Sequence, residues 1–219
     1  PRLPAGKNCC VSWPHSIMAD LLLDPLPTEW AGRAIRWDFR PMVWLSNQYL
    51  RGRADTDPES LSLEALRRFY IRPVPPQETP EAFAALLEFY AGGEAPEARD
   101  AAAQRTSRPQ ELAFDYACDA PAIVAAFQQA YRIDLTTERL HWWRFRALFS
   151  ALPECTTMAR IMGYRTMDLS GMQGKELQHY AELKEAFALP QSLRRNQHPV
   201  TLSEHNAEFL ARFQHDRER

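Results

Sequence analysis

The run TERLHWWRFRALFSAL, residues 137–152, constrains the fold of this chain more than any other stretch. On a helical wheel of about 100° per residue, its large apolar and aromatic side chains occupy most of the circumference. The polar remainder is a narrow stripe formed by Arg139, Arg146 and Ser150. A helix that is apolar nearly all round belongs at the centre of its domain. We therefore expect the other elements of this part of the chain to pack around it.

Two further helices have clear boundary signals. Thr79 and Pro80 are the expected cap and first residue of a helix whose large apolar side chains recur at i, i+3, i+4 and i+7. The pair Gly92-Gly93 ends that pattern, as expected of a helix C-terminus. Asp119 is the expected cap of another helix that follows it directly.

A short β-hairpin is predicted ahead of these helices. Ala31-Gly32 separates two short runs, and Ile35, Trp37 and Phe39 alternate with charged residues in the second run. Because the chain has 17 prolines and only 8 glycines, prolines that punctuate helices fit it better than a sheet with many glycine turns. The predicted fold class is therefore mostly α, with one or more small helical domains and a short N-terminal hairpin. Further helices are expected over residues 41–50, 58–71, 156–163 and 174–189, and after a capping box at Thr201 and Glu204.

Two further predictions concern individual residues of these helices. His141 falls on the flank of the helix expected over residues 137–152. In the segment 174–189, the spacing predicts an inward-facing set: Leu177, Tyr180, Ala181 and Phe187.

The predicted organisation has five segments. Residues 1–17 lack periodicity and are expected to be a non-native or disordered extension, with Met18 as the natural start. Residues 18–92 hold the hairpin and the first helices. Residues 93–112 are polar and rich in Ala and Pro, which is typical of a flexible linker. Residues 113–190 form a helical domain, and residues 191–219 an additional helix and tail.

Composition and motifs argue against several function classes. The net charge is −2, and no apolar run is long enough to span a membrane or to serve as a signal peptide. The four cysteines show no C-x-x-C spacing, which indicates reduced structural thiols. Nucleotide-binding loops, nucleophile elbows and metal-binding motifs are absent from the sequence. We therefore expect no enzymatic activity, no cofactor and no metal.

Tryptophan and arginine are the residues that suggest a binding function. Both are favoured anchors at interfaces, but the wide apolar arc around Trp142 and Trp143 favours a place in the core. Arginine outnumbers lysine 23 to 3. A cluster of arginines could bind carboxylates or phosphates, although solvated or ion-paired arginines are the more common arrangement. That cluster comprises Arg139, Arg144, Arg146, Arg160 and Arg165.

The segment between Phe114 and Leu189 resembles a known family. FDYACDAPAIVAAFQQAYRIDL, LHWWRFRALFSAL, IMGYRTMDLS and KELQHYAELKEAFALP, in this order and spacing, closely resemble the bacteriophage gene product fifteen family. The stretches LLLDPLPTEW and RAIRWDFRPMVWL also look like the opening of that family. The resemblance covers about residues 20–190 and leaves out both ends of the chain.

The resemblance implies a function in the assembly of phage tails. Proteins of this family are encoded in the tail module beside the tape-measure gene, which implies a tail-assembly chaperone that binds the tape-measure protein in the cytoplasm of the bacterial host. Self-association is a further possibility. The alternatives are a structural component of the virion tail and a helical nucleic-acid-binding module, and nucleic acid is the less expected partner. The residues expected to bind the partner are Trp142, Arg144, Arg146, Arg160, Tyr164 and Arg165.

Overall fold

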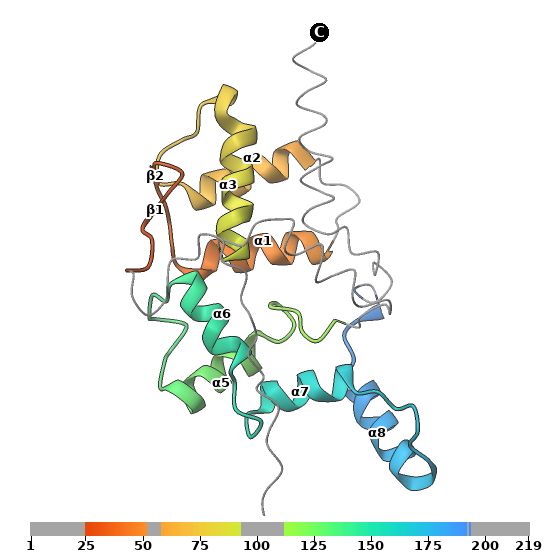
Figure 1. Ribbon diagram of the computed structural model, residues 1–219. Helices are drawn as coiled ribbons and strands as arrows, with labels where there is room; N and C mark the ends of the chain where they lie inside the picture. The colour runs from red at the N-terminus through yellow and green to blue at the C-terminus, as the bar shows by residue number, and fades with distance from the viewer. Residues whose placement is uncertain (1–24, 52–57, 93–111, 192, 194–219) are drawn as a thin grey trace, which may run out of the picture.

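The computed structural model describes residues 25–51, 58–92, 112–191 and 193 (Figure 1). Over these residues the chain is mostly α-helical with a two-stranded antiparallel sheet near the N-terminus, which confirms the predicted fold class. No helix in the described segments has the length and the apolar composition needed to cross a membrane. The elements are β1 (Glu29–Trp30), β2 (Arg33–Ala34), α1 (Phe39–Arg51), α2 (Pro58–Phe69), η1 (Pro76–Glu78), α3 (Thr79–Ala91), α5 (Ala120–Tyr131), α6 (Trp142–Ser150), α7 (Thr157–Thr166) and α8 (Gly174–Ala186).

Several predictions concern residues outside the described segments. They include the extension over residues 1–17, the start at Met18, nearly all of the linker over residues 93–112, and the capping box at Thr201 and Glu204. These statements stay predictions.

The hairpin is present but shorter than its sequence pattern. β1 pairs antiparallel with β2 through a turn at Ala31 and Gly32, whose φ values of 50° and 72° fit a type I′ turn. The second strand ends at Ala34, where the alternating pattern predicts a longer strand.

The Ile35 N–H still donates to the Thr28 carbonyl before β1, and residues 35–38 also pair with other parts of the chain. Ile35 forms an isolated antiparallel bridge to Tyr70, and Asp38 forms another to His141. The alternation of apolar and polar residues that predicts a strand here is therefore satisfied by two distant partners. These bridges connect the hairpin to the end of α2 and to the start of α6.

Helix α6 lies at the centre of the hydrophobic core, as its sequence predicts. The Phe145 ring is stacked with Phe39 of α1, at 4.8 Å between ring centroids, and with Phe127 of α5, at 5.1 Å. Phe145 is 1% exposed and Trp142 is equally buried. Each of these two rings lies within 10° of parallel to Phe145, so both are stacked on it.

The helices that precede residues 93–111 in the sequence and the helices that follow them share one hydrophobic core. The same buried cluster extends from Ile35 and α1 through α2, α3, α5 and α6 to Met158 of α7. In Figure 1, α1 lies between α2 and α3 above it and α6 below it. The helices predicted within residues 18–92 and 113–190 therefore bury their apolar faces against one another.

Helix α6 begins later than predicted, because the apolar pattern places this helix over residues 137–152. The helix begins at Trp142, and His141 is its N-cap rather than a residue of its flank. The Nδ1 atom of His141 accepts a hydrogen bond of 3.1 Å from the backbone N–H of Trp143. Arg139 therefore precedes the helix, where its guanidinium lies 4.6 Å from the centroid of the Trp37 ring.

Helix α3 begins one residue earlier than predicted and ends where predicted. Its N-cap is Glu78, which makes no capping hydrogen bond through its side chain, so Thr79 is already inside the helix. At the other end Gly92 adopts φ 86°, a left-handed conformation that glycine tolerates best. Its backbone N–H donates to the carbonyl of Phe89, which closes the last turn.

The two C-terminal helices differ most from their predictions. Helix α7 continues through Gly163 to Thr166, because no turn signal accompanies that glycine. Helix α8 ends at Ala186 and contains no buried residue, so its predicted inward face does not enter the core. Leu177 is 37% exposed, and Tyr180 is only half-buried.

Replacement of Gly92 by Ala should destabilise the fold by about 1–2 kcal/mol, because a left-handed φ disfavours a Cβ atom. The added Cβ would also lie 2.8 Å from Nη1 of Arg146. The matched control is Gly163→Ala, since Gly163 is helical and its added Cβ would have no neighbour within 4 Å. That variant should gain up to about 1 kcal/mol from helix propensity. Urea unfolding measures both, and equal effects would contradict this account.

Candidate partner-binding surface

The last carbonyls of α3 accept hydrogen bonds from α6. Trp142 donates from Nε1 to the carbonyl of Tyr90 at 2.9 Å, and Trp143 donates from Nε1 to that of Phe89 at 2.8 Å. Arg146 donates from Nη1 to the same Tyr90 carbonyl at 3.2 Å. The last carbonyls of a helix lack the usual partners within it, so these bonds supply donors there, and at Phe89 the indole adds to the bond from the Gly92 N–H.

This arrangement explains the HWWR run in physical terms. An indole ring is large and apolar but has one N–H, so it can fill a core and still bind a carbonyl at its edge. Trp142 is 1% exposed and Trp143 is 5% exposed. The structure therefore selects the core alternative for both. Trp142 is buried in this conformation, and its assignment to the partner-binding residues stays a prediction.

His141 connects the start of α6 to the segment before the hairpin. Its Nδ1 atom accepts from the Trp143 backbone, so Nε2 carries the proton that is donated to the carbonyl of Pro27 at 3.1 Å. Burial lowers the pKa of the His141 imidazole, although the hydrogen bond to Pro27 acts in the opposite direction. The ring also lies parallel to that of Trp37, with 6.0 Å between centroids.

Arg165 and Asp119 form a buried ion pair between α7 and the start of α5. The guanidinium donates from Nη1 to Oδ2 at 2.6 Å and from Nη2 to Oδ1 at 2.9 Å. It also binds the carbonyls of Ala113 and of Phe187, the residue that caps the C-terminus of α8. Asp119 occupies the N-cap position of α5 as predicted, but its carboxylate binds Arg165 and the backbone N–H of Asp115 instead of capping the helix.

Arginine binds backbone carbonyls elsewhere in the described residues as well. Arg36 donates to the carbonyl of Arg67 at 2.8 Å and to that of Tyr70, at the C-terminus of α2. Arg40 donates to the carbonyls of Leu135 and Glu138 in the loop before α6. A planar guanidinium with several donors can reach more than one carbonyl at once. These contacts favour the structural interpretation of the arginine-rich composition.

The other predicted site residues have different surroundings. Arg165 is 8% exposed and its guanidinium binds Asp119 and two carbonyls, and its assignment to the partner-binding residues stays a prediction. Arg146 is half-buried against Trp142 and Tyr90. Arg144 and Arg160 are exposed, and Tyr164 is half-buried with its ring stacked on that of Phe187 at 5.6 Å. A partner-binding role for these last three residues stays a prediction.

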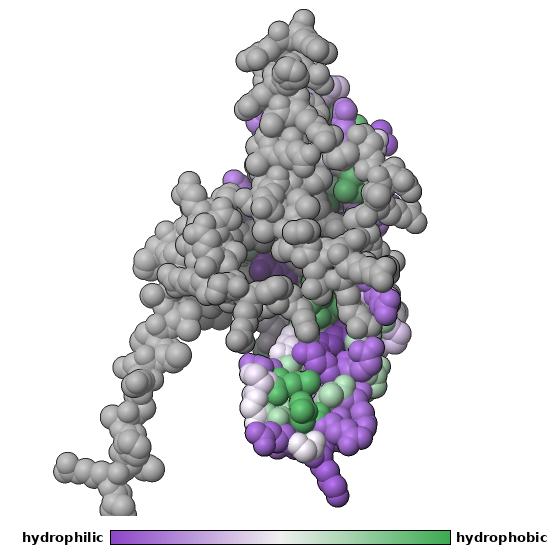
Figure 2. Space-filling view, turned by 90° about the vertical axis from the view of Figure 1, so that its right-hand side faces the viewer, coloured by the Kyte–Doolittle hydropathy of each residue, from purple (hydrophilic) through white to green (hydrophobic). Residues whose placement is uncertain are grey.

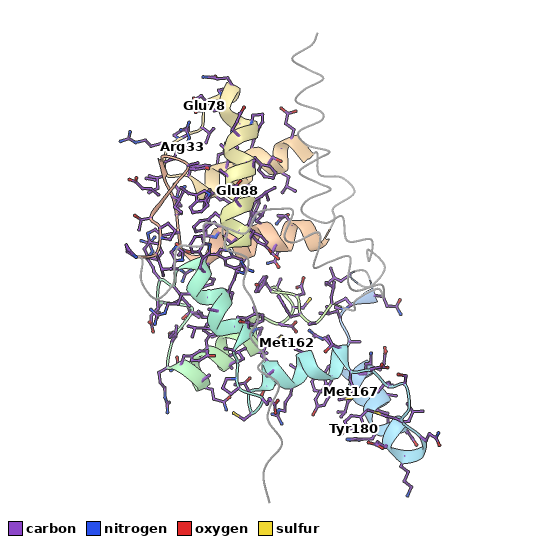
Figure 3. All side chains as sticks on the ribbon, in the orientation of Figure 1. Arg33, Glu78, Glu88, Met162, Met167 and Tyr180 are labelled. Carbon is purple, nitrogen blue, oxygen red and sulfur yellow. The ribbon has the colours of Figure 1, made fainter. Side chains whose placement is uncertain are left out.

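Helix α8 and the residues before it carry half-buried or exposed apolar side chains outside the core, and three of them, Leu177, Tyr180 and Ala181, are predicted to face inward. We call this set of side chains the α8 patch, and none of its residues belongs to the hydrophobic core or packs against it. Figure 2 shows apolar residues between hydrophilic ones at the lower end of the side on which α8 lies, and Figure 3 shows Met167 and Tyr180 where α7 meets α8. The patch consists of Met167, Leu169, Met172, Leu177, Tyr180 and Ala181.

The described residues contain no cluster of three or more His, Cys, Asp or Glu side chains that could hold a metal ion. The two cysteines in this part of the chain, Cys118 and Cys155, are exposed and form no disulfide. In the described segments we assign no set of side chains to catalysis.

Comparison with known families agrees with the sequence resemblance. Residues 63–189, more than half of the chain, match the family described as Bacteriophage Gp15 protein. The chain therefore belongs to the bacteriophage Gp15 protein family. Membership makes it a phage structural or morphogenesis protein. No curated protein and no solved structure matches the chain.

The matched range covers most of the described helices. It begins within α2 and includes α3, the central helix α6, the Arg165–Asp119 pair and the α8 patch. The hairpin and α1 lie before it. The resemblance of the N-terminal stretches to the opening of the family therefore stays a prediction.

Acidification should destabilise this protein in part through His141. Because its pKa is lowered in the folded state, the unfolded state binds the proton more readily, and stability is lost as pH falls below about 6.5. His141→Asn keeps a capping acceptor but removes the titrating group. Its unfolding free energy should fall less between pH 7 and pH 5, measured in urea. His179→Asn, on the exposed side of α8, serves as the control and should behave as the unmodified chain does.

Loss of the Arg165 guanidinium should leave the Asp119 carboxylate buried without its cation. Arg165→Met is expected to cost about 3–5 kcal/mol in unfolding free energy, whereas the exposed Arg160→Met should cost less than about 0.5 kcal/mol. The double variant Arg165→Met with Asp119→Leu should recover part of the loss, because no uncompensated charge remains. Thermal and urea unfolding test this, and a harmless Arg165→Met would contradict it.

Proposed function

We propose that this protein is a tail-assembly chaperone that binds the tape-measure protein in the cytoplasm of the host, without enzymatic activity. The observation that carries the proposal is the α8 patch, an apolar helix surface left outside the core of a protein that belongs to a phage morphogenesis family. Exposed contiguous apolar surface marks interaction sites in soluble proteins. A helical surface of this kind suits the binding of another amphipathic helix.

The physical requirements of that role agree with such a surface. A tape measure is a very long helical protein, and its apolar stripes would aggregate before the tail tube surrounds them. A chaperone must cover these stripes and still be displaced by the tube subunits, so each contact has to be small and reversible. A small apolar patch provides weak contacts of this kind, and many copies along one filament provide the coverage.

The arginine contacts bear on the alternative of a nucleic-acid-binding module. Arg146 and Arg165 bind carbonyls or a carboxylate inside the protein, and Arg139 is paired with Asp38 at 3.4 Å. These contacts leave only part of the cluster for phosphates. The other alternative is a structural component of the virion tail. Such a component would stay bound to its partner through the α8 patch.

Co-expression with the tape-measure protein of the same phage tests the proposal. The tape measure should become soluble and co-purify with this chain, and the chain should be absent from purified virions by mass spectrometry. Leu177→Asp should reduce the co-purified tape measure several-fold, because it places a charge in the α8 patch. Leu63→Asp is the matched control, since Leu63 on α2 has the same exposure of 37%.

Three results would contradict the proposal. An insoluble tape measure with nothing co-purified would remove the chaperone function. Presence of the chain in purified virions would favour a structural tail component. Salt-dependent binding to DNA, with no retention of the tape measure, would favour the nucleic-acid module.

A further inference from the structure

The last turn of α7 lies against the last turn of α8. Tyr164 stacks on Phe187 with 5.6 Å between ring centroids, and Arg165 donates from Nε to the carbonyl of Phe187 at 2.6 Å. Lys184 donates from Nζ to the carbonyl of Met167, the C-cap of α7, at 2.9 Å. We call these three contacts the base of α8. The chain leaves the base at Met167 and returns to it at Phe187.

The residues between these two points project away from the base. Helix α8 has 13 residues and therefore a length of about 20 Å. None of the apolar side chains over residues 168–183 belongs to the hydrophobic core or packs against it. In Figure 1, α8 lies at the lower right, beyond the end of α7. The contacts of the base therefore stabilise a helix to which the core contributes no packing.

Asp119 fixes the orientation of the Arg165 guanidinium within the base. Nη1 and Nη2 donate to the two carboxylate oxygens at 2.6 Å and 2.9 Å, and Nη1 also donates to the carbonyl of Ala113 at 3.2 Å. Asp119 is 6% exposed, so this bidentate pair is shielded from water. Because the guanidinium is planar, bonds at both Nη atoms also set the direction of the Nε–H bond toward Phe187.

The contacts of this guanidinium are unequal. Asp119 accepts two hydrogen bonds and supplies an opposite charge, whereas Phe187 accepts one bond through an uncharged carbonyl. Loss of the Phe187 contact would leave both bonds to Asp119 in place. Arg165 would then keep the orientation in which it can bind Phe187 again.

We infer that residues 167–187 form an arm that opens and closes as one unit, and that Asp119 is a positioning residue for its closed state, acting through Arg165. The inference deepens the proposed function, because the arm carries the α8 patch, and it rests on that function only for the purpose of the movement. Opening changes the position of the patch while the helices around Phe145 stay folded. Tyr164 and Arg165 act on the patch from the base of α8.

Hydrogen exchange of the full chain, followed by mass spectrometry, tests the arm without a partner. After correction for intrinsic exchange rates, the amides of α8 should exchange at least about tenfold faster than those of α6, because the arm opens without global unfolding. The α6 amides of the same sample record the global stability. Equal protection of the two helices would overturn the inference, since α8 would then open only when the whole protein unfolds.

Two lysines of α8 provide a matched pair of variants. Lys184→Met removes the bond to Met167 and should accelerate exchange several-fold along the whole of α8, with α6 unchanged. Lys175→Met, at an exposed position near the start of α8, should leave the exchange of both helices unchanged. Acceleration limited to the last turn would show that the helix end frays, and it would contradict opening as one unit.

Asp119→Asn tests the action through Arg165. It should accelerate the exchange of α8 more than that of α6, although Asp119 lies at the start of α5. Combined with Arg165→Met, it should accelerate α8 no further than Arg165→Met alone, because the carboxylate acts through the guanidinium. If Arg165→Met does not fold, Arg165→Lys replaces it, since lysine keeps the charge but has a single donor nitrogen. Additive effects on α8 would overturn the positioning role.

The outcomes separate this inference from the proposed function. Equal protection of α8 and α6 overturns the inference even if the tape measure co-purifies with the chain. If the arm opens as inferred and the tape measure is not retained, the inference stands, and the result counts against the proposed function alone.

Discussion

The hydrogen bonds at the C-terminus of α3 connect the helices that precede residues 93–111 to the helices that follow them. The carbonyls of Phe89 and Tyr90 accept from the indoles and the guanidinium of α6, so a helix end formed early in the chain is completed by residues more than fifty positions later. Gly92 permits this approach, because a side chain there would meet Arg146. The aromatic stack around Phe145 then fills the space between α1, α5 and α6.

The sequence predicts those parts of the fold that depend on local pattern. The apolar circumference of residues 137–152 identifies the central helix, and Gly92 identifies the end of α3. The same reasoning fails at His141, because a histidine at a helix N-cap leaves no periodic signal and acts through one hydrogen bond to the backbone. It also fails for α8, since amphipathic spacing indicates an apolar face but not whether the same chain covers it.

The candidate site was harder to predict, because Trp and Arg serve both cores and interfaces. Arg165 is buried because Asp119, 46 residues away, supplies a matching carboxylate, and no local pattern connects the two. Trp142 is buried because its N–H finds a carbonyl at the end of another helix. Leu177, Tyr180 and Ala181 are predicted to face the interior for the opposite reason: they are apolar, and nothing in their spacing indicates that the core lies elsewhere.

The position of α8 outside the core also gives the molecule two levels of stability. Its apolar side chains share no surface with the aromatic cluster, and the contacts of its last turn with α7 include the Arg165 bond to Phe187 and the stack of Phe187 on Tyr164. Because α8 contributes no residue to that cluster, its opening is expected to leave the packing around Phe145 unchanged. A helix that opens independently can adjust its shape to each segment it meets, while the rest of the protein stays folded.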